Sequence, residues 1–459
     1  MDNDTIKNTV LITVMLGSFL IPFMGTSLNL ALPSIQKEFL LDAVILSWIP
    51  TVFILANAAL ILPFGRLADI HGRKRIFLYG VITYTLASFL AAISPSGIFL
   101  LIFSFLQGVG CSMIFGTGVA LISSVFQPME RGKAYGIYIA SVYTGIFSGL
   151  ILGGFLIQQF GWRSIFLFNI PFGILLTLLV LFEIKLDWTG SKGEKFDFLG
   201  AILFFFIIIA LMEGFSNLSG IFGKYLLFAG LLGILIFYRI EKNLEYPLIK
   251  TSIFKNRVFT ISIVSILIIN VGTTAITLLL SLYLQYLKQL TPNEAGVILL
   301  LQPLAVAFLS PFIGRISDKI EIRVLSSAGM AITTIGLFSF TILNSTTSLS
   351  SIILGLILVG TGLALFSSPV TNAAMSSVSK KIYGAASATV STMVFTGQVL
   401  SLGVVILIFA VYLGNVQIIP QFYNEFLKSA NLAFIIYTLI CFIAIFPLVL
   451  MGKKTISED

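Results

Sequence analysis

The residues of this sequence that could bind a ligand are mainly neutral hydrogen-bonding side chains in very apolar surroundings. Asn270, Thr274, Thr277 and Ser281 follow one another at intervals of four, three and four residues. On a helix this spacing places them in one continuous stripe. Because unsatisfied polar groups are costly among apolar ones, the stripe indicates a surface that meets water or a ligand. The alternative is that the hydroxyls bond carbonyls of their own helix and the amide joins two helices.

Residue types used in catalysis and metal binding are scarce. The sequence has one histidine and two cysteines, and no Cys-x-x-Cys, His-x-x-x-His or Gly-x-x-x-x-Gly-Lys motif. It therefore predicts no metal site, no cofactor and no enzymatic activity. Glu213 is the one carboxylate expected well inside an apolar segment, where it could serve as a proton carrier. The alternative is an interfacial position, about one turn from the end of an inserted helix expected at the periphery.

The elements that carry these residues are predicted to be membrane-spanning helices. The chain of 459 residues is 58% hydrophobic and 10% charged, and its mean hydropathy of +1.06 excludes a water-soluble enzyme. A spanning helix needs about 20 apolar residues. The predicted spans are 9-32, 44-64, 76-93, 98-125, 134-158, 164-184, 197-216, 225-239, 258-284, 294-313, 324-343, 350-376, 386-412 and 431-451.

Cationic side chains are distributed unevenly between the two membrane faces. The net charge is +8, from 27 Lys and Arg against 19 Asp and Glu. If the fourteen segments alternate from a cytoplasmic N-terminus, all cations lie inside except Lys37, Arg163, Lys224, Lys288 and Lys428. This is the positive-inside bias. It predicts a multi-pass protein of the cell membrane, embedded in lipid, with both termini cytoplasmic and no nucleic-acid partner.

The order of the segments predicts an all-α integral membrane protein with its helices arranged 6+2+6. The expected units are a first half at 1-184, a linker with two inserted transmembrane helices at 185-257, and a second half at 258-459. The loop 65–75 recurs in part at 314–319, 249 residues later, which indicates two homologous six-helix halves. Thr291-Pro292-Asn293-Glu294 predicts a capping box at the start of the tenth helix.

The loop 65–75 also carries a family resemblance. It reads Gly-Arg-Leu-Ala-Asp-Ile-His-Gly-Arg-Lys-Arg and resembles the pattern Gly-x-Leu-Ala-Asp-x-x-Gly-Arg-Lys of the major facilitator superfamily. Further matches are Leu32-Pro33 after Asn29, Gln107-Gly108-x-Gly110, Gly161-Trp162-Arg163 with Phe166, and Asn169-x-Pro171. The 6+2+6 order resembles the fourteen-helix drug/proton antiporter branch. The resemblance implies the major facilitator fold, a monomer, and a small organic substrate exchanged for protons.

Three positions depart from the pattern of that branch. Met24 stands where an aspartate is common, Ser104 where an arginine is expected, and Leu150 where the antiporter signature has proline. These departures leave open an uncoupled facilitator or a substrate-specific exporter with different coupling. A non-transporting membrane receptor on the same fold is a further alternative, because fold does not fix function.

The resemblance implies a conformational latch at the loop 65–75 that favours the outward-open state. Asp69 would accept hydrogen bonds at the start of the thirteenth helix, near Gly384. The alternative is that the cations of this loop only fix topology and bind anionic lipid. The expected latch residues are Gly65, Asp69, Gly72, Arg73 and Arg131, and their counterparts in the second half are Gly314, Arg315 and Asp318.

The remaining expected machinery is a glycine face and a central cavity. Gly145, Gly149, Gly153 and Gly154 in the fifth helix form a small-residue face, interpreted as a rocking interface between the halves or as static packing. The expected cavity residues are Phe23, Met24, Ser27, Ser104, Gln107, Tyr138, Asn270, Thr274, Thr277, Ser368, Phe395 and Gln398. Such a cavity suits neutral or amphipathic organic compounds, and multidrug efflux by proton antiport and alternating access is the expected function.

Overall fold

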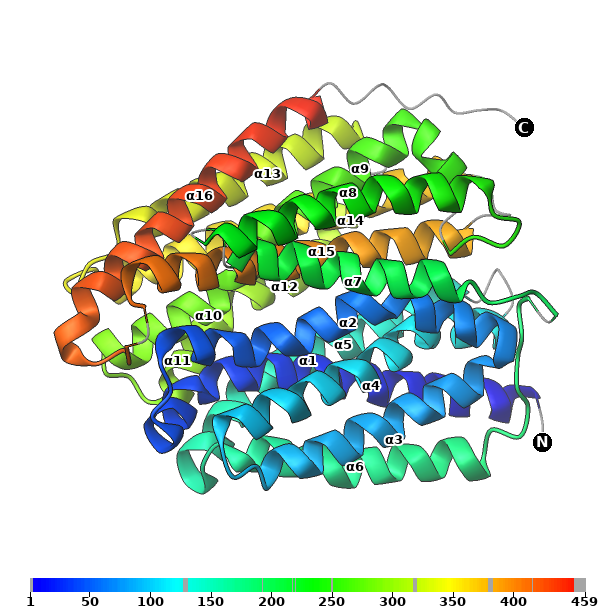
Figure 1. Cartoon of the computed structure of the whole chain (residues 1–459), viewed down its shortest axis with the longest axis horizontal. Coiled ribbons are helices and arrows are strands. Elements are labelled where there is room, and N and C mark those ends of the chain that lie inside the picture. Colours follow the sequence, from blue (N-terminus) through cyan, green and yellow to red (C-terminus); the bar gives the residue numbers. More distant parts are fainter. Residues whose placement is uncertain are drawn as a thin grey trace.

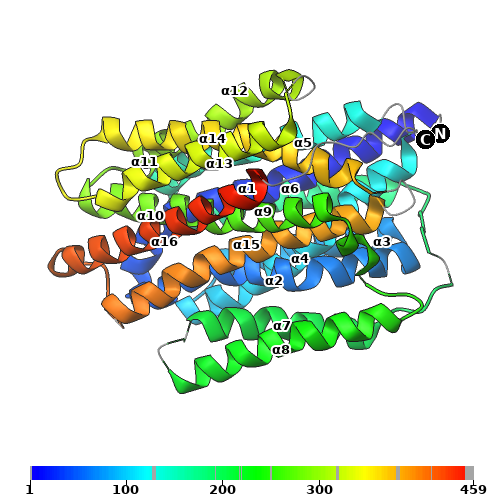
Figure 2. The same ribbon diagram turned by 90° about the horizontal axis from the view of Figure 1, so that it is seen from above.

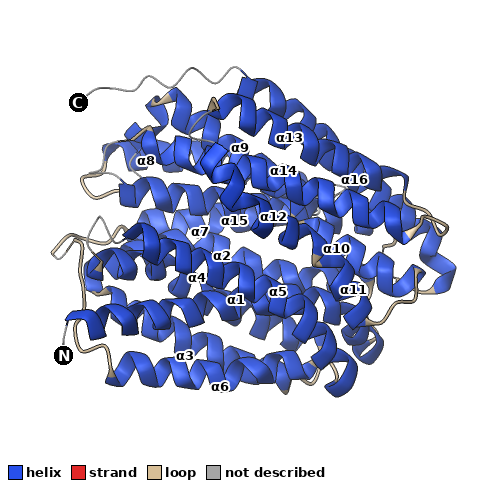
Figure 3. Cartoon of the chain, turned by 180° about the vertical axis from the view of Figure 1, so that it is seen from behind, coloured by secondary structure: helices blue, strands red, loops and turns tan. Residues whose placement is uncertain are grey.

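The computed structural model describes residues 3–126, 131–191, 193–216, 218, 220–248, 251–316, 320–378, 383–414 and 416–449. All regular secondary structure in these ranges is helical (Figure 3). The helices of the first half and of the insert are α1 (Asn3–Phe39), α2 (Ala43–His71), α3 (Arg73–Ala92), α4 (Gly97–Val125), α5 (Arg131–Phe160), α6 (Arg163–Phe182), α7 (Phe198–Ser216) and α8 (Ile221–Asn243).

The second half contains more helical pieces than spans. Its elements are η1 (Thr251–Lys255), α9 (Arg257–Thr273), α10 (Ala275–Leu282), η2 (Tyr283–Leu287), α11 (Pro292–Leu299), α12 (Leu301–Ile316), α13 (Ile322–Ser339), η3 (Phe340–Ile342), α14 (Leu349–Ser376), α15 (Tyr383–Tyr412), η5 (Pro420–Phe422) and α16 (Tyr423–Val449). The segment η2 is a π-helical turn. Together α9, α10 and η2 form one span, Arg257–Leu287.

The prediction of fourteen spans is confirmed: fourteen helical stretches of the described chain are long and apolar enough to cross a membrane. Local signals also set several boundaries. The side chain of Asp42 caps α2 by accepting a 2.7 Å hydrogen bond from the Ile45 amide. The predicted capping box is present, because Thr291 and Glu294 bond each other reciprocally at the start of α11. The eighth span is longer than expected, so that Glu241 lies inside α8.

The six helices α1–α6 form one bundle and α9–α16 form the other, lying beside it (Figure 1). Because the number of spans is even, the start of α1 and the end of α16 lie on the same membrane side as the loop 65–75. We call this the terminal side and the opposite one the far side. One apolar core of buried side chains continues from α1 through α10 into α16.

The inserted pair α7–α8 forms an additional layer on one flank of the two bundles (Figure 2). Helix α7, expected at the periphery, lies in this outer layer (Figure 2) but packs against both α2 and α15. A second apolar core joins these three helices and includes Leu62, Met212 and Val399. Helix α7 therefore covers the seam between the halves on this flank.

Candidate functional site

The predicted polar stripe of α9 and α10 is partly accessible along most of its length. Asn270, Thr274 and Thr277 are half-buried, whereas Ser281, one turn further toward the far side, is fully buried. Asn270 Nδ2 donates to the Ile266 carbonyl at 2.8 Å and Thr274 Oγ1 to the Asn270 carbonyl at 2.7 Å. The Thr274 hydroxyl thus bonds its own helix, as the alternative expects, but the Asn270 amide also bonds its own helix and does not join two helices. Both side chains remain partly accessible.

The span that carries this stripe stays helical through Thr274, the residue between α9 and α10, which has a φ of −64° and a ψ of −44°. The amide of Ala275 donates to Ser401 Oγ of α15 at 3.1 Å, so its hydrogen bond is supplied from a neighbouring helix. The hydroxyl of Tyr437 in α16 holds the Ser401 carbonyl at 2.6 Å. Ser401 is fully buried and was not predicted. Its hydroxyl accepts the hydrogen bond of the Ala275 amide at the depth of the polar stripe.

Helix α1 supplies the opposite wall with a largely apolar stripe. Phe19, Gly25 and Asn29 are half-buried on one helical face, and no atom would lie within 4 Å of a Cβ added at Gly25. The open space beside Gly25 marks this face as the lining of a hollow. The Asn29 carboxamide has no hydrogen bond within the described chain, and its Oδ1 is completely buried. Gly25 was missed by the sequence analysis, and Asn29 served there only as a family match.

The remaining wall residues come from α4, α14 and α15. The rings of Phe115 in α4 and Phe395 in α15 meet across the halves at 6.1 Å. In α14, Gly360 faces α12 and Gly362 faces α13, whereas the exposed Ser368 lies on the helix face turned away from both. The predicted residues Phe395 and Ser368 are therefore accessible, as is the half-buried Gln398. Phe115 is an addition to the prediction.

Five predicted cavity residues of the first half are instead buried inside that half: Phe23, Met24, Ser27, Ser104 and Gln107. The Phe23 ring packs on Phe168 of α6 at 4.6 Å, and Met24 Sδ accepts a hydrogen bond from Asn169 Nδ2 at 3.4 Å. Ser27 Oγ donates to the Gly149 carbonyl of α5 at 3.0 Å. Gln107 Nε2 donates to Ser88 Oγ of α3 at 2.7 Å. Their hydrogen bonds and ring contacts join helices of one bundle, which corrects their expected placement.

Two other predicted residues lie at intermediate positions. Tyr138 is half-buried in α5. Glu213 is half-buried in α7, directly after the fully buried Met212 that packs against α15. The sequence analysis missed a second buried carboxylate, Glu241 in α8, which is only 1% exposed. The insert therefore contains two carboxylates at least partly withdrawn from water, on the helix pair beside the seam.

The far-side ends of the two halves are in close contact. Ser281 Oγ donates to the Asn29 carbonyl at 2.9 Å, and Gln285 Nε2 donates to the Leu30 carbonyl at 3.1 Å. The hydroxyl of Tyr286 also bonds Gln36. Each of these bonds joins α1 to α10 or η2, across the halves. The polar stripe is therefore closed toward the far side.

The glycines of α5 have two different roles. A Cβ at Gly145, Gly149 or Gly153 would collide with Phe19, Phe23 or Ser27 of α1, so these three glycines allow close packing inside the first half. Only Gly154 faces the second half, where its Cβ would lie 2.9 Å from the Pro292 carbonyl of α11. The predicted interface between the halves is thus corrected to Gly154 alone of the four.

Except for Gly72, the predicted loop 65–75 is helical, because residues 65–71 complete α2 and residues 73–75 begin α3. Within this motif, Asp69 is bonded to Arg73. Asp69 Oδ1 accepts from Arg73 Nε at 2.9 Å and Nη2 at 2.7 Å. Arg73 Nη1 continues to α4, where it donates to the Ala120 carbonyl at 3.1 Å and to Ser124 Oγ at 2.6 Å. Gly65 packs near the Gly116 carbonyl of the same helix. The motif therefore ties α2 and α3 to α4.

The described residues 185–191 and 193–197, which lead from α6 to α7, lie across this loop. The amides of Gly190 and Ser191 both donate to the Asp69 carbonyl at 3.0 Å, and Glu194 pairs with Arg66. Gly72 has a φ of +120°, and a Cβ there would lie 2.6 Å from Cγ of Asp187. Only glycine fits both this backbone conformation and this contact. The loop is thus held from outside by the chain that enters the insert, which nothing in the sequence analysis anticipated.

Several latch predictions fall outside the described residues. They include the side chains of Arg131 and Arg315, the surroundings of Gly314 and Gly384, and the whole of Asp318. The proposed contact of Asp69 with the start of α15 stays a prediction.

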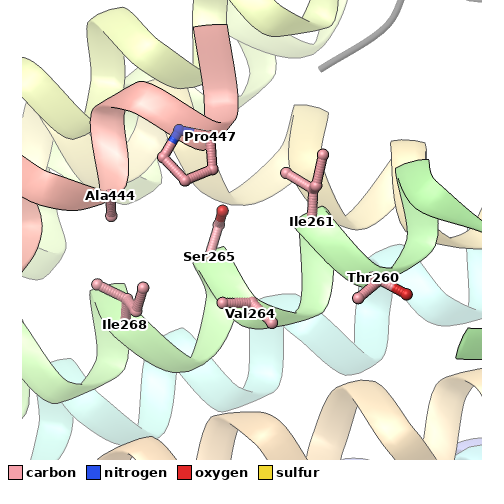
Figure 4. A pocket seen from close by; sticks show the side chains of 7 residues that line it. All are labelled: Thr260, Ile261, Val264, Ser265, Ile268, Ala444 and Pro447. Carbon is pink, nitrogen blue, oxygen red and sulfur yellow. The ribbon is translucent and has the colours of Figure 1, made fainter. Parts of the chain in front are cut away.

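Two cavities in the described chain have apolar linings and lie apart from the polar stripe. One of about 120 Å³ lies between α9 and α16, where Ser265, Ile268, Ala444 and Pro447 line it (Figure 4). The other, of about 410 Å³, lies between α2 and α7 and includes Phe64 and Phe205. Neither lining contains a charged side chain. Linings of this kind favour hydrocarbon groups over charged ones.

Comparisons with known proteins agree with this arrangement. Residues 14–402 match the Major Facilitator Superfamily. The riboflavin transporter RibZ of Clostridioides difficile (strain 630) is 30% identical over 98% of both chains. The multidrug resistance protein Stp of Mycobacterium tuberculosis (strain CDC 1551 / Oshkosh) is 30% identical over 88% of this chain and 76% of that protein. The puromycin resistance protein pur8 of Streptomyces alboniger is 30% identical over 86% of this chain and 80% of that protein.

Solved structures show the same fold at lower identity. A crystal structure of the peptide transporter POT in complex with sulfate aligns with a TM-score of 0.72 and 14% identity, covering 99% of this chain and 100% of that one. A bacterial homologue of the lysosomal transporter Spinster aligns with a TM-score of 0.68 and 15% identity, covering 97% of each chain. By sequence match and by fold, this multi-pass membrane protein belongs to the Major Facilitator Superfamily of transporters.

Proposed function

We propose that this protein is a secondary active transporter that exports neutral or amphipathic organic compounds by alternating access, in exchange for protons. The observation that carries the proposal is the pair of unlike walls between the halves. Asn270, Thr274 and Thr277 form a polar wall, and the face of α1 with Phe19 and Gly25 forms a largely apolar one. A molecule with a hydrogen-bonding edge and a hydrophobic body is complementary to this pair.

The chemistry of the walls favours uncharged substrates or substrates of low charge. The accessible polar groups on α9 and α10 are an amide and two hydroxyls. None of these groups carries a negative charge to compensate a desolvated cation. The Phe115–Phe395 pair offers aromatic surface from both halves.

Export is the direction that we propose, and the charge distribution and the closed far side are compatible with it. The positive-inside bias supports a cytoplasmic position of the terminal side. Because Ser281 and Gln285 close the far side, the structure corresponds to a state that receives substrate from the cytoplasm. The relatives named for multidrug and puromycin resistance support export. For the proton, Glu213 is the proposed carrier, since it lies on a helix that contacts both halves.

Reconstitution into liposomes with an imposed pH gradient tests the proposal. We expect uptake of riboflavin, puromycin or another amphipathic compound into inverted vesicles that are acidic inside, accompanied by proton release from the lumen. Thr277→Val, which removes one hydroxyl at nearly constant volume, should raise KM about fivefold, as loss of one net hydrogen bond predicts. The matched Thr334→Val, at a hydroxyl bonded to Met330 inside the second half, should leave KM unchanged. Absence of flux across a broad amphipathic panel would contradict the proposal.

An uncoupled facilitator is the second candidate, and one observation favours it. Met24, at the position where the antiporter branch commonly has an aspartate, is fully buried and bonded to Asn169. That position is used for packing and carries no titratable group. Substrate flux without proton movement would establish this candidate. Unchanged pH dependence in Glu213→Gln would exclude Glu213 as the carrier while leaving coupling through another carboxylate to be measured directly.

A further inference from the structure

Proline at position 33 leaves one carbonyl of α1 without its helical partner. In an α-helix the amide of residue 33 would donate to the carbonyl of residue 29, but proline has no amide hydrogen. Pro33 lies inside the continuous helix α1, in its far-side third. The carbonyl of Asn29 is therefore open to another donor at a depth where an unsatisfied group is costly.

The donor comes from the other half of the protein. Ser281 Oγ of α10 bonds the Asn29 carbonyl at 2.9 Å, and Ser281 is fully buried. Gln285, one turn later, donates both to the neighbouring Leu30 carbonyl at 3.1 Å and to Ser281 Oγ at 3.0 Å. The two side chains thus form one connected network on adjacent carbonyls of α1.

The geometry of α10 and η2 presents these donors together. Ser281 and Gln285 are four residues apart and share a helical face. Gln285 lies inside the π-helical turn Tyr283–Leu287. Tyr286 of the same turn also reaches α1 and bonds Gln36. π-Helical turns occur frequently at functional positions. Every one of these groups is neutral, so the contact can open without separating buried charges.

We propose that Pro33 creates the far-side gate: the carbonyl it frees on Asn29 is the docking point for Ser281, with Gln285 as the second bond. Opening the far side breaks these bonds and exposes the carbonyls to water, which then satisfies them. Closing restores the Ser281 bond. The gate rests on the proposed alternating access, but it does not depend on what the substrate is.

Thiol labelling at position 25 measures how often the far-side gate opens, and it needs no substrate. The reporter is Gly25→Cys in a background with Cys111 and Cys441 replaced by serine, because the Gly25 Cβ position faces open space. A membrane-impermeant maleimide is applied to right-side-out and inverted vesicles, and the far-side labelling rate is compared with the terminal-side rate. Ser281→Ala should raise far-side labelling about threefold to tenfold, the change that loss of one net hydrogen bond produces in an equilibrium. The control Ser326→Ala, whose hydroxyl bonds its own helix at the Ile322 carbonyl, should change nothing.

A double-mutant cycle isolates the role of the proline. Pro33→Ala restores an amide that competes for the Asn29 carbonyl, so it should raise far-side labelling as Ser281→Ala does. Because both changes abolish the same bond, the double variant should label no faster than either single variant. Additive effects, or unchanged labelling in Ser281→Ala, would overturn the proposal. If Pro33→Ala fails to reach the membrane, Ser281→Thr, which keeps a hydroxyl, must restore the parent labelling rate, and failure to do so also overturns it.

Failure of the gate and failure of the proposed function are distinguishable. If labelling changes as expected but the protein moves no compound across liposome membranes, the proposed gate is supported and the proposed transport function is contradicted. Transport with labelling that is insensitive to Ser281 does the reverse.

Discussion

At the scale of single residues, glycine has opposite meanings at two helical positions. Gly25 of α1 faces open space, whereas a Cβ at Gly149 of α5 would lie 2.5 Å from the Phe23 carbonyl. Glycine in a helix interior costs roughly 0.5–1 kcal/mol relative to alanine. That cost is offset at Gly149 by close packing of α5 on α1, and at Gly25 by nothing in the fold. Close helix packing therefore does not explain the glycine at position 25.

We expect alanine substitutions to separate these two roles. Gly25→Ala should raise the thermal unfolding temperature in detergent slightly, since it gains helix propensity without a collision. Gly149→Ala should lower it, because overpacking of a fitted contact costs about 1–3 kcal/mol. Thermal melting followed by tryptophan fluorescence measures both. Equal shifts in the two variants would show that the Gly149 contact is loose.

The placement of individual side chains was the least predictable part of the site. Helix α1 is apolar on all sides, so the sequence does not show which face meets the hollow. Ser27 and Met24 were expected in the cavity. Instead, Ser27 Oγ donates to the Gly149 carbonyl, and Met24 Sδ accepts a hydrogen bond from Asn169. The stripe of α9 and α10 was predicted better because its polar residues are periodic. Asn29 had a signal that was not used: it stands four residues before Pro33.

At the scale of elements, boundaries were predictable where a local signal exists. The capping box at Thr291 and the apolar lengths of the spans are examples, because both depend on nearby residues alone. The hydrogen bond from the Ala275 amide to Ser401 Oγ was not predictable, because the two residues are 126 positions apart in the sequence. The same applies to the loop 65–75, whose motif predicts a tight connection but not the described residues 185–191 and 193–197 that lie across it.

That loop gives a prediction at the element scale. Asp69→Asn removes the charge that holds Arg73, and through Arg73 the contact of α3 with α4 at Ser124. We expect transport to fall at least about tenfold, by loss of more than one charge-assisted bond, while the amount of protein in the membrane stays the same. Flux in liposomes, normalised to protein, is the measurement.

Asp187→Asn is the matched control. Asp187 pairs with the exposed Arg75 and accepts a 2.9 Å bond from the Lys74 amide, which an asparagine oxygen can also accept. Exposed pairs contribute little, so transport should remain close to that of the parent. Normal flux in Asp69→Asn, or an equal loss in both variants, would contradict a specific role for Asp69.

At the scale of the whole molecule, the insert links the two halves that the proposed alternating access would move apart. Its leading segment is bonded to the first half through Arg66 and Glu194, whereas Met212 packs against Gly403 of the second half. The 6+2+6 order was visible in the sequence. The side of the bundles on which the inserted pair lies was not, because one apolar helix surface resembles another.

A cross-link tests how α7 moves. Met212→Cys and Gly403→Cys, in the background without native cysteines, place two thiols on α7 and α15, where the Met212 sulfur now lies 3.0 Å from a Cβ at Gly403. A short bifunctional thiol reagent should join them and inhibit transport, with recovery when a cleavable linker is reduced. Inhibition of either single-cysteine variant by the same reagent would point to a local effect. Full transport in the cross-linked protein would show that α7 moves with α15.

The position of α7 and α8 also determines how a compound dissolved in the bilayer can approach the site. Lipid on the flank of α2 and α15 meets the inserted pair before it meets the seam between the halves (Figure 2). The seam of α5 and α11 has no such cover among the helices described, and there Gly154 lies against Pro292. The two lateral seams are therefore unequal: helix α7 covers one of them, and direct packing of α5 on α11 closes the other.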